Sequence, residues 1–238
     1  MMTKKEICAR IQDIGIIPAI WVSSEEDASF AADSLAGGGI PILEITVEGP
    51  ETLDLIAHLV RSRSEMIVGA GTVLDCDTAK LAVDAGAHFL TAPGFDYSIV
   101  EFAAKQDLAV IPGALTPTEV VTAWRVGSDF VKVFPCSQVG GDKYIKALKK
   151  ALPQISLVAS GGVTQHTACG FILAGAAALG VGMDLIPPDA IARRQVERIQ
   201  ELAHRFIGFV KDARDRIQAG KRNAVVQRRP SVKEFEKQ

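Results

Sequence analysis

The sequence predicts an α/β protein, a single (β/α)8 TIM barrel with an N-terminal helix and a C-terminal helical extension. The length of 238 residues suits one barrel domain. Eight short apolar runs alternate with segments of helical periodicity, as successive βαβ units require. The first strand–helix junction lacks the GxGxxG pattern of a dinucleotide-binding sheet. Together these observations favour a closed parallel barrel over an open doubly wound sheet.

Glycine or proline occurs at most junctions between the expected elements. The expected strands are residues 16–22, 42–46, 66–69, 89–91, 109–111, 130–133, 156–159 and 177–181. The expected helices between them are residues 25–36, 52–61, 78–85, 98–105, 118–124, 142–152 and 165–173. Gly86 and Gly175 each follow an apolar helical segment, which is typical of a glycine C-cap before the next strand.

Both ends of the chain extend this repeat. Residues 3–14 predict a short helix that plugs the N-terminal mouth of the barrel. Residues 189–218 have apolar side chains at helical spacing, and we expect them to pack on the barrel as an extended eighth helix. We therefore divide the chain into a barrel domain, residues 1–219, and a basic tail, residues 220–238. The tail is typical of a solvated terminus, although it also suits an anion or a neighbouring subunit.

Composition excludes several classes of function. A net charge of -2 and a pI near 6.1 argue against nucleic acid as the main partner. No apolar run reaches the roughly 18 residues of a membrane span, and the N-terminus has no apolar signal core, so we expect a cytoplasmic protein. The four cysteines are widely spaced, which predicts reduced thiols and neither a disulfide framework nor a zinc site. The four histidines share no face, so we expect no metal and no cofactor.

The most informative residue is Lys132, in the middle of an apolar strand bounded by Asp129 and Pro135. An ammonium group flanked by Phe and Val is poorly solvated, so it must pair with an anion, lose its proton or react. A neutral amine of this kind attacks carbonyl groups to form Schiff bases. A purely structural ion pair is the alternative.

Strand alternation supplies the partner of this amine. If Lys132 points into the barrel, Phe130 and Phe134 share its side, because neighbouring residues of a strand face opposite ways. On the second strand the same rule directs Glu44 and Thr46 inward. The sequence therefore predicts an acid and an amine near the same mouth of the barrel. This is the mouth at the carboxyl ends of the strands, where the active sites of this fold lie. A carboxyl group there shuttles protons during imine formation.

Other strand ends supply the expected binding residues. Thr72 follows a glycine-rich third strand, and its hydroxyl can bind a substrate carboxylate. Pro93 begins a stiff turn after the fourth strand, which would wall the same pocket. Gly161, Gly162 and Gly182 follow strands seven and eight, where backbone N–H groups of a barrel commonly cradle a phosphate. Tight strand–helix packing is the alternative for these glycines.

Five segments occur in the order of a known family. They are LEIT around Glu44, VGAGTVL around Thr72, APG at Pro93, KVFPCS from Lys132 and SGGVT from Ser160. With these segments the chain resembles the class I aldolases of 2-keto-3-deoxy-6-phosphogluconate (KDPG) and 4-hydroxy-2-oxoglutarate (KHG). The YIKAL segment at residues 144–148 and the GMDL segment at residues 182–185 are similar to the 2-keto-3-deoxy-6-phosphogalactonate (KDPGal) branch. The resemblance implies a homotrimer, no metal and pyruvate as one product.

Three positions depart from the family pattern. Glu48 stands where the phosphogluconate branch has an arginine for the substrate carboxylate, and Trp21-Val22 stands where the phosphogalactonate branch has an arginine. Gly182 stands where the phosphogluconate branch has a serine, so only backbone N–H groups can donate hydrogen bonds to a phosphate there. The resemblance therefore supports the Schiff-base chemistry more strongly than any one substrate.

The resulting expectation is a class I aldolase in which Lys132 attacks the C2 ketone of a 2-keto-3-deoxy sugar acid such as KDPG. Glu44 would transfer protons as the C3–C4 bond breaks to give pyruvate and an aldehyde such as glyceraldehyde 3-phosphate. Two alternatives remain open. One is a pyruvate-forming lyase for a different, unphosphorylated 2-keto acid such as KHG, and the other is a non-catalytic phosphosugar-binding barrel.

Overall fold

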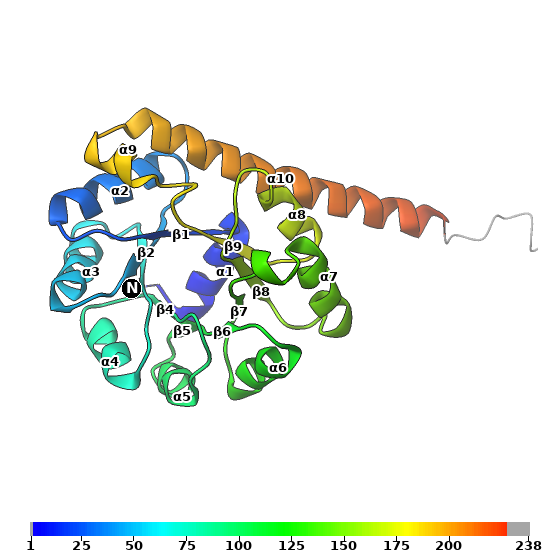
Figure 1. The fold of residues 1–238 in the computed structure, drawn as a ribbon, viewed down its shortest axis with the longest axis horizontal. Coiled ribbons are helices and arrows are strands. Elements are labelled where there is room, and N and C mark those ends of the chain that lie inside the picture. Colours follow the sequence, from blue (N-terminus) through cyan, green and yellow to red (C-terminus); the bar gives the residue numbers. More distant parts are fainter. Residues whose placement is uncertain (1, 228–238) are drawn as a thin grey trace, which may run out of the picture.

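The computed structural model describes residues 2–227, in which a ring of parallel strands is surrounded by helices (Figure 1). Nine strands form one sheet in the order β5-β4-β3-β2-β1-β9-β8-β7-β6. The strands are β1 (Ile16–Ile20), β2 (Ile42–Thr46), β3 (Ile67–Gly71), β4 (Phe89–Thr91), β5 (Ala109–Ile111), β6 (Gly113–Ala114), β7 (Val131–Val133), β8 (Leu157–Ser160) and β9 (Ala178–Val181). The two strands at the ends of the order, β5 and β6, are separated in sequence only by Pro112, so the barrel is nearly closed.

The helices lie outside this ring. They are α1 (Lys4–Ile14), α2 (Glu25–Gly37), α3 (Pro50–Ser62), α4 (Cys76–Asp84), α5 (Tyr97–Lys105), α6 (Pro117–Val126), α7 (Asp142–Ala151), α8 (Ala168–Leu173), α9 (Pro188–Ala192) and α10 (Val196–Gln227), with a 3-10 turn, η1 (Ser137–Val139). Both faces of the sheet are covered, so β2 and β3 are buried along their whole length. This is the environment in which parallel strands become continuous apolar runs.

Several strand boundaries differ by one or two residues from the sequence-based prediction, and two differences affect the description of the barrel. The first strand ends at Ile20 and not at residue 22, which places Trp21 in the loop above the barrel. The short strand β6 was not predicted, because Gly113 and Ala114 form no apolar run and Pro112 lacks the N–H that would continue the ladder.

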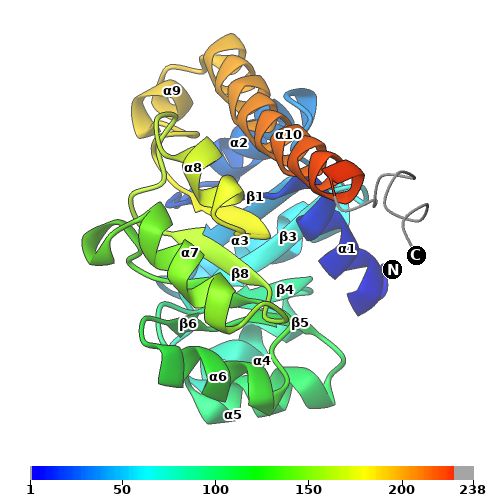
Figure 2. The ribbon, with the colours of Figure 1, turned by 90° about the vertical axis from the view of Figure 1, so that its right-hand side faces the viewer.

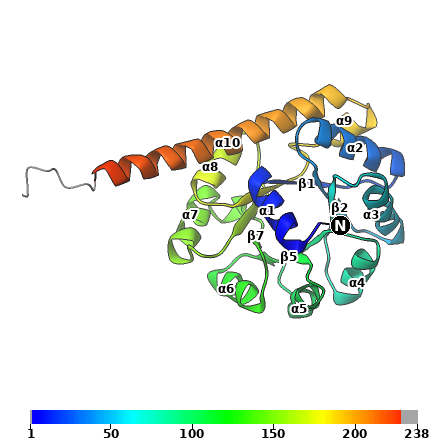
Figure 3. The ribbon, with the colours of Figure 1, turned by 180° about the vertical axis from the view of Figure 1, so that it is seen from behind.

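Helix α1 lies across the end of the barrel at which the strands begin, as the sequence predicts (Figure 3). Thr3 and Glu6 form a capping box at its start. Gly15 ends it in the left-handed conformation, with φ of 72°, and leads directly into β1. Ile7 and Ile11 face the barrel and are buried, so the helix closes the bottom of the core.

The expected single helix at residues 189–218 is two helices, α9 and α10. The chain turns between them at Arg194, which has a φ of 53°, a left-handed conformation uncommon for a residue with a side chain. The Arg194 guanidinium lies 2.9 Å from a carboxylate oxygen of Glu26, 2.6 Å from one of Asp27 and 5.1 Å from the Phe30 ring centroid. These long-range contacts hold the turn against α2, and local helical periodicity gave no sign of them.

Helix α10 runs along the outside of the barrel and packs against α8 and α2 (Figure 2). It continues to Gln227, so no helix end falls at residue 219, and the division of the chain there stays a prediction. Residues 228–238 of the expected basic tail lie outside the described residues. Within residues 2–227, no helix combines the length and the apolar character needed to cross a bilayer.

Replacing Gly69 by alanine tests how tightly the barrel interior is packed. An added Cβ would lie 2.2 Å from the ring of Phe89, which is completely buried on the neighbouring strand. We expect Gly69→Ala to lower the free energy of unfolding by about 1–3 kcal/mol, the usual cost of overpacking a core. Urea-induced unfolding, monitored by circular dichroism, measures this change in the free energy of unfolding.

Gly208→Ala is the matched control, because a Cβ at that position in α10 would meet nothing within 4 Å. Helix propensity predicts a gain of about 0.5–1 kcal/mol for this change. A Gly69→Ala protein as stable as the original chain would contradict the packing described here.

Candidate active site

Lys132 lies in the middle of β7, and its side chain points into the barrel. Val131 and Val133, on either side of it, are completely buried on the opposite face of the strand. The Lys132 side chain is 13% exposed. Its Nζ lies 5.5 Å from the centroid of the Phe134 ring, which shares its side of the strand as predicted. Alternation along one strand therefore correctly predicted the direction of this amine.

Glu44 reaches the same point from β2, a strand separated from β7 by three others in the sheet order. Its side chain is 6% exposed, and its Oε1 lies 3.9 Å from Lys132 Nζ. At this separation the two groups form an ion pair without a direct hydrogen bond, so a substrate oxygen bound between them would contact both. The sequence-based prediction that the acid and the amine meet inside the barrel is confirmed by this distance.

A cavity of about 270 Å³ opens above this pair at the carboxyl ends of the strands. Its lining residues are Ala19, Trp21, Glu44, Thr46, Thr72, Pro93, Lys132, Phe134, Ser160, Gly161, Gly162, Val163, Gly180, Val181, Gly182, Met183 and Asp184. All seven residues predicted for the site from the sequence line this one cavity. The volume is near the lower end of the range for small-molecule sites, so it suits a compact ligand.

The glycine pair after β8 forms a turn that other residues could not easily adopt. Gly161 and Gly162 have φ of 82° and 83°, the left-handed region that favours glycine. Ser137 donates a hydrogen bond of 2.9 Å from its hydroxyl to the Gly162 carbonyl, and an added Cβ on Gly162 would lie 2.0 Å from that hydroxyl oxygen. This hydrogen bond joins the loop after β7 to the loop after β8. The backbone of the loop after β8 forms part of the cavity wall.

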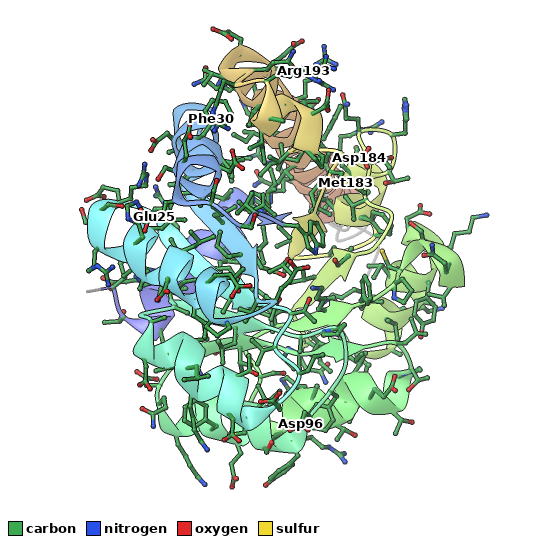
Figure 4. The ribbon with its side chains drawn as sticks, turned by 60° about the vertical axis from the view of Figure 1, so that its left-hand side comes forward. Glu25, Phe30, Asp96, Met183, Asp184 and Arg193 are labelled. Atoms are coloured by element: carbon green, nitrogen blue, oxygen red, sulfur yellow. The ribbon has the colours of Figure 1, made fainter. Side chains whose placement is uncertain are left out.

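The far end of the cavity contains residues that the sequence did not single out. Met183 and Asp184 lie on the loop between β9 and α9, and both line the cavity (Figure 4). Ser160, at the end of β8, also lines it. Beyond their membership of the GMDL and SGGVT segments, their sequence signal is a position at a strand end, which they share with many residues that point elsewhere. Trp21, whose ring lies 3.3 Å from the place of a Gly182 Cβ, covers that glycine.

The charges around the cavity are mainly negative. Among its lining residues, Lys132 is the one cation, and Glu44 and Asp184 are the anions. Glu48, which stands at the sequence position of a family arginine, is exposed and does not line the cavity. Within residues 2–227, no group of three or more His, Cys, Asp or Glu side chains has the geometry to hold a metal ion. The cavity thus presents one amine and two carboxyl groups to its ligand.

Comparison with known proteins identifies relatives of this chain. The family model for KDPG and KHG aldolase matches residues 7–202. The chain is 35% identical over 196 residues to the 2-dehydro-3-deoxy-phosphogluconate aldolase of Pseudomonas aeruginosa, which covers 80% of this chain and 89% of that protein. Its fold is similar to that of KDPG aldolase from Legionella pneumophila with pyruvate captured as a covalent carbinolamine (TM-score 0.77, 28% identity, 83% of this chain and 96% of that chain). A native KDPGal structure is similar to the same degree (TM-score 0.77, 29% identity, 84% and 96%).

The cysteine next to the lysine strand is not a second nucleophile. Cys136 is completely buried, and its Sγ lies 3.4 Å from the Gly161 carbonyl oxygen. Burial raises the pKa of its thiol to about 11, and burial, followed by the charge of Asp129, raises that of Cys8 to about 12. The thiolate is the reactive form, and at pH 8 it accounts for only on the order of 0.1% of Cys136.

We therefore expect Cys136 and Cys8 to resist iodoacetamide at pH 8 in the folded protein. Digestion and mass spectrometry after a short exposure should find both residues unmodified. The same treatment in urea, where the desolvation is lost, should modify both. Full modification of Cys136 in the folded protein would contradict its assignment as a packing residue.

Proposed function

The chain belongs to the KDPG and KHG aldolase family, and from this membership we propose that it is a class I aldolase that cleaves KDPG to pyruvate and glyceraldehyde 3-phosphate. The observation that carries the proposal is the distance of 3.9 Å between Lys132 Nζ and Glu44 Oε1 inside the cavity. An amine sheltered from water beside a carboxyl group is the arrangement that imine chemistry requires. A barrel that only binds a phosphosugar has no need for such a pair.

Catalysis begins when Lys132 passes a proton to Glu44 and the resulting amine attacks the C2 ketone of the substrate. As the carbinolamine forms, a proton moves from the nitrogen to the C2 oxygen. Glu44 supplies the proton with which the hydroxyl group leaves as water, and the product is an iminium. Glu44 then takes the proton of the C4 hydroxyl group. The C3–C4 bond breaks, its electron pair moves into the iminium to form an enamine, and the aldehyde leaves. Return of a proton to C3 and attack of water on C2 release pyruvate and restore the amine.

The remaining residues of the cavity would hold the two ends of the substrate. We assign the pyruvoyl end to Thr72 and Pro93, which line the cavity together with the Lys132–Glu44 pair. We assign the phosphate to the backbone N–H groups around Gly161, Gly162 and Gly182, because these glycines bring the main chain to the cavity wall. The cavity requires no metal or cofactor for this chemistry, since the iminium itself accepts the electron pair.

We further propose that β5 and β6 are two halves of one strand interrupted at Pro112. This count makes the barrel a (β/α)8 barrel, with residues 1–219 as its domain and residues 220–238 as a tail. A cytoplasmic homotrimer is the proposed assembly. The large apolar side chains Leu81, Tyr97 and Trp124, which are 54%, 58% and 41% exposed on the neighbouring helices α4, α5 and α6, support an interface between subunits.

A second candidate substrate is an unphosphorylated 2-keto acid such as KHG. Asp184 lines the end of the cavity assigned to the phosphate, and the Trp21 ring covers Gly182 there. Apart from Lys132, no lining residue carries a positive charge. A carboxylate repels the dianionic phosphate of KDPG more strongly than the single negative charge on the terminal carboxylate of KHG.

Borohydride trapping tests the Schiff base. With pyruvate and sodium borohydride, we expect a reduced pyruvyl adduct on Lys132 and on no other lysine, located by peptide mass spectrometry. Lys132→Ala should abolish both the adduct and pyruvate release. Glu44→Gln should still form the adduct but turn over about 10²–10⁴-fold more slowly, because it lacks the proton shuttle.

Lys149→Ala is the matched control for trapping. Burial lowers the pKa of the Lys149 amine, but this amine donates to the carbonyl oxygens of Pro153 and Ile155, far from the cavity lining. Its removal should leave the adduct on Lys132 unchanged. Full pyruvate release by Lys132→Ala would reject the mechanism, and tight ligand binding without any adduct would favour a binding protein.

Asp184→Asn distinguishes the two candidate substrates. Removal of a carboxylate beside a phosphate should lower KM for KDPG by about 3–10-fold at low ionic strength, while KM for KHG, which has a singly charged carboxylate at that end, should fall less. A coupled lactate dehydrogenase assay measures the released pyruvate. A kcat/KM for KHG well above that for KDPG in the unmodified protein would favour the unphosphorylated substrate.

A further inference from the structure

The Thr91 hydroxyl group is buried without a hydrogen-bond partner. Thr91 is the last residue of β4, and it is 2% exposed. Within residues 2–227, its Oγ1 and the Oγ of Ser34 are the two side-chain oxygen or nitrogen atoms that are fully buried and make no hydrogen bond. An unsatisfied hydroxyl of this kind costs about 1–3 kcal/mol of folding free energy. A valine has the same shape without this cost, so the hydroxyl group needs an explanation.

Glu44 lies directly beside this hydroxyl group. The Glu44 Oε1 and the Thr91 Oγ1 lie 2.2 Å and 2.3 Å from one point, the place that a Cβ on Gly71 would occupy. Strand β3, which contains Gly71, lies between β2 and β4 in the sheet. Because Gly71 has no side chain, nothing separates the carboxylate oxygen from the hydroxyl oxygen across this strand. The two atoms are neighbours in the barrel interior, although they are not hydrogen-bonded in the resting structure.

Thr91 does not line the substrate cavity. Its hydroxyl group lies next to Glu44, which does line the cavity. We therefore treat Thr91 as a positioning residue that acts through Glu44 and not as a catalytic one.

We propose that Thr91 positions Glu44 for proton transfer by donating a hydrogen bond from its hydroxyl group to Oε1 of the ionised carboxylate. This inference rests on the proposed function. Once Lys132 carries the substrate as an iminium, its nitrogen keeps at most one hydrogen, so Glu44 loses much of the partner it has in the resting enzyme. The Thr91 hydroxyl then holds the anion in the orientation that accepts the C4 hydroxyl proton. When Glu44 becomes protonated the hydrogen bond weakens, and the carboxyl group is free to return its proton to C3.

The charged groups around Glu44 determine how the pH dependence is interpreted. Lys132 on β7 and Asp184 after β9 are the other ionisable side chains that line the cavity. Strands β3, β4 and β8 contribute no ionisable side chain to the lining. A change at Thr91 alters neither of these two groups. A shift in the pH profile of a Thr91 variant therefore reports on Glu44.

Thr91→Val and Thr91→Ser test the proposal in the full-length enzyme. Valine keeps the shape and removes the donor, and we expect kcat/KM to fall by about 10–100-fold, the effect of one hydrogen bond to a charged group. Loss of a donor to the anion should also move the acidic limb of the kcat–pH profile, which reports on the enzyme with bound substrate, upward by about one pH unit. Serine keeps the donor, so its profile should match that of the unmodified enzyme. Both variants should form the borohydride-reduced adduct, because Lys132 is intact.

Ser34→Ala is the control, since it removes the other unpaired buried hydroxyl, which lies in α2 and away from the site. Ser34→Ala should not shift the pH profile, even if it changes Tm. If Thr91→Val changes Tm but keeps the pH profile and kcat/KM of the unmodified enzyme, Thr91 is structural and the proposal is overturned. If the unmodified protein neither traps nor releases pyruvate, the proposed function fails first, and the role of Thr91 fails with it.

Discussion

The burial of Lys132 beside Glu44 is the constraint on which the rest of the site depends. The two side chains are 13% and 6% exposed, and their charged atoms lie 3.9 Å apart in an otherwise apolar barrel. Desolvation of two ions costs several kcal/mol each, and their attraction seldom repays that cost better than apolar packing would. The pair is therefore poorly explained by stability. It is well explained by chemistry, because an amine and a carboxyl group 3.9 Å apart are close enough to exchange protons directly or through a bound substrate oxygen.

Small residues create the space in which this pair works. A side chain on Gly69 would collide with Phe89, and one on Gly113 would lie 2.0 Å from the Pro93 backbone. Gly71 leaves open the space where the Glu44 carboxylate meets the Thr91 hydroxyl. These glycines let the strands and turns approach closely at the top of the barrel, so the geometry of the carboxyl group is set by residues that have no functional group themselves. Packing and catalysis are in this way two consequences of the same glycine positions.

The residues that line the cavity fall into two groups. The amine, the carboxyl group, Thr72 and Pro93 suit a keto acid, and they match the reaction that relatives of this chain share. The glycine turns line the same cavity as the Trp21 ring and the Asp184 carboxylate. The negative charge of Asp184 sets this protein apart from the arginine-bearing pattern that its family resemblance implies.

Local sequence patterns were sufficient to predict the parallel barrel, the direction of Lys132 and Glu44, and the glycine turns around the cavity. These features follow from local rules: strand alternation has a period of two, and the strand ends of a parallel barrel meet at one face. The tertiary structure alone decided that Arg194 breaks the last helix, that Glu48 stays outside the cavity, and that Asp184 enters it. It also decided that Thr91 lies against Glu44. Each of these depends on a distance between residues remote in the chain, and no local pattern carries that information.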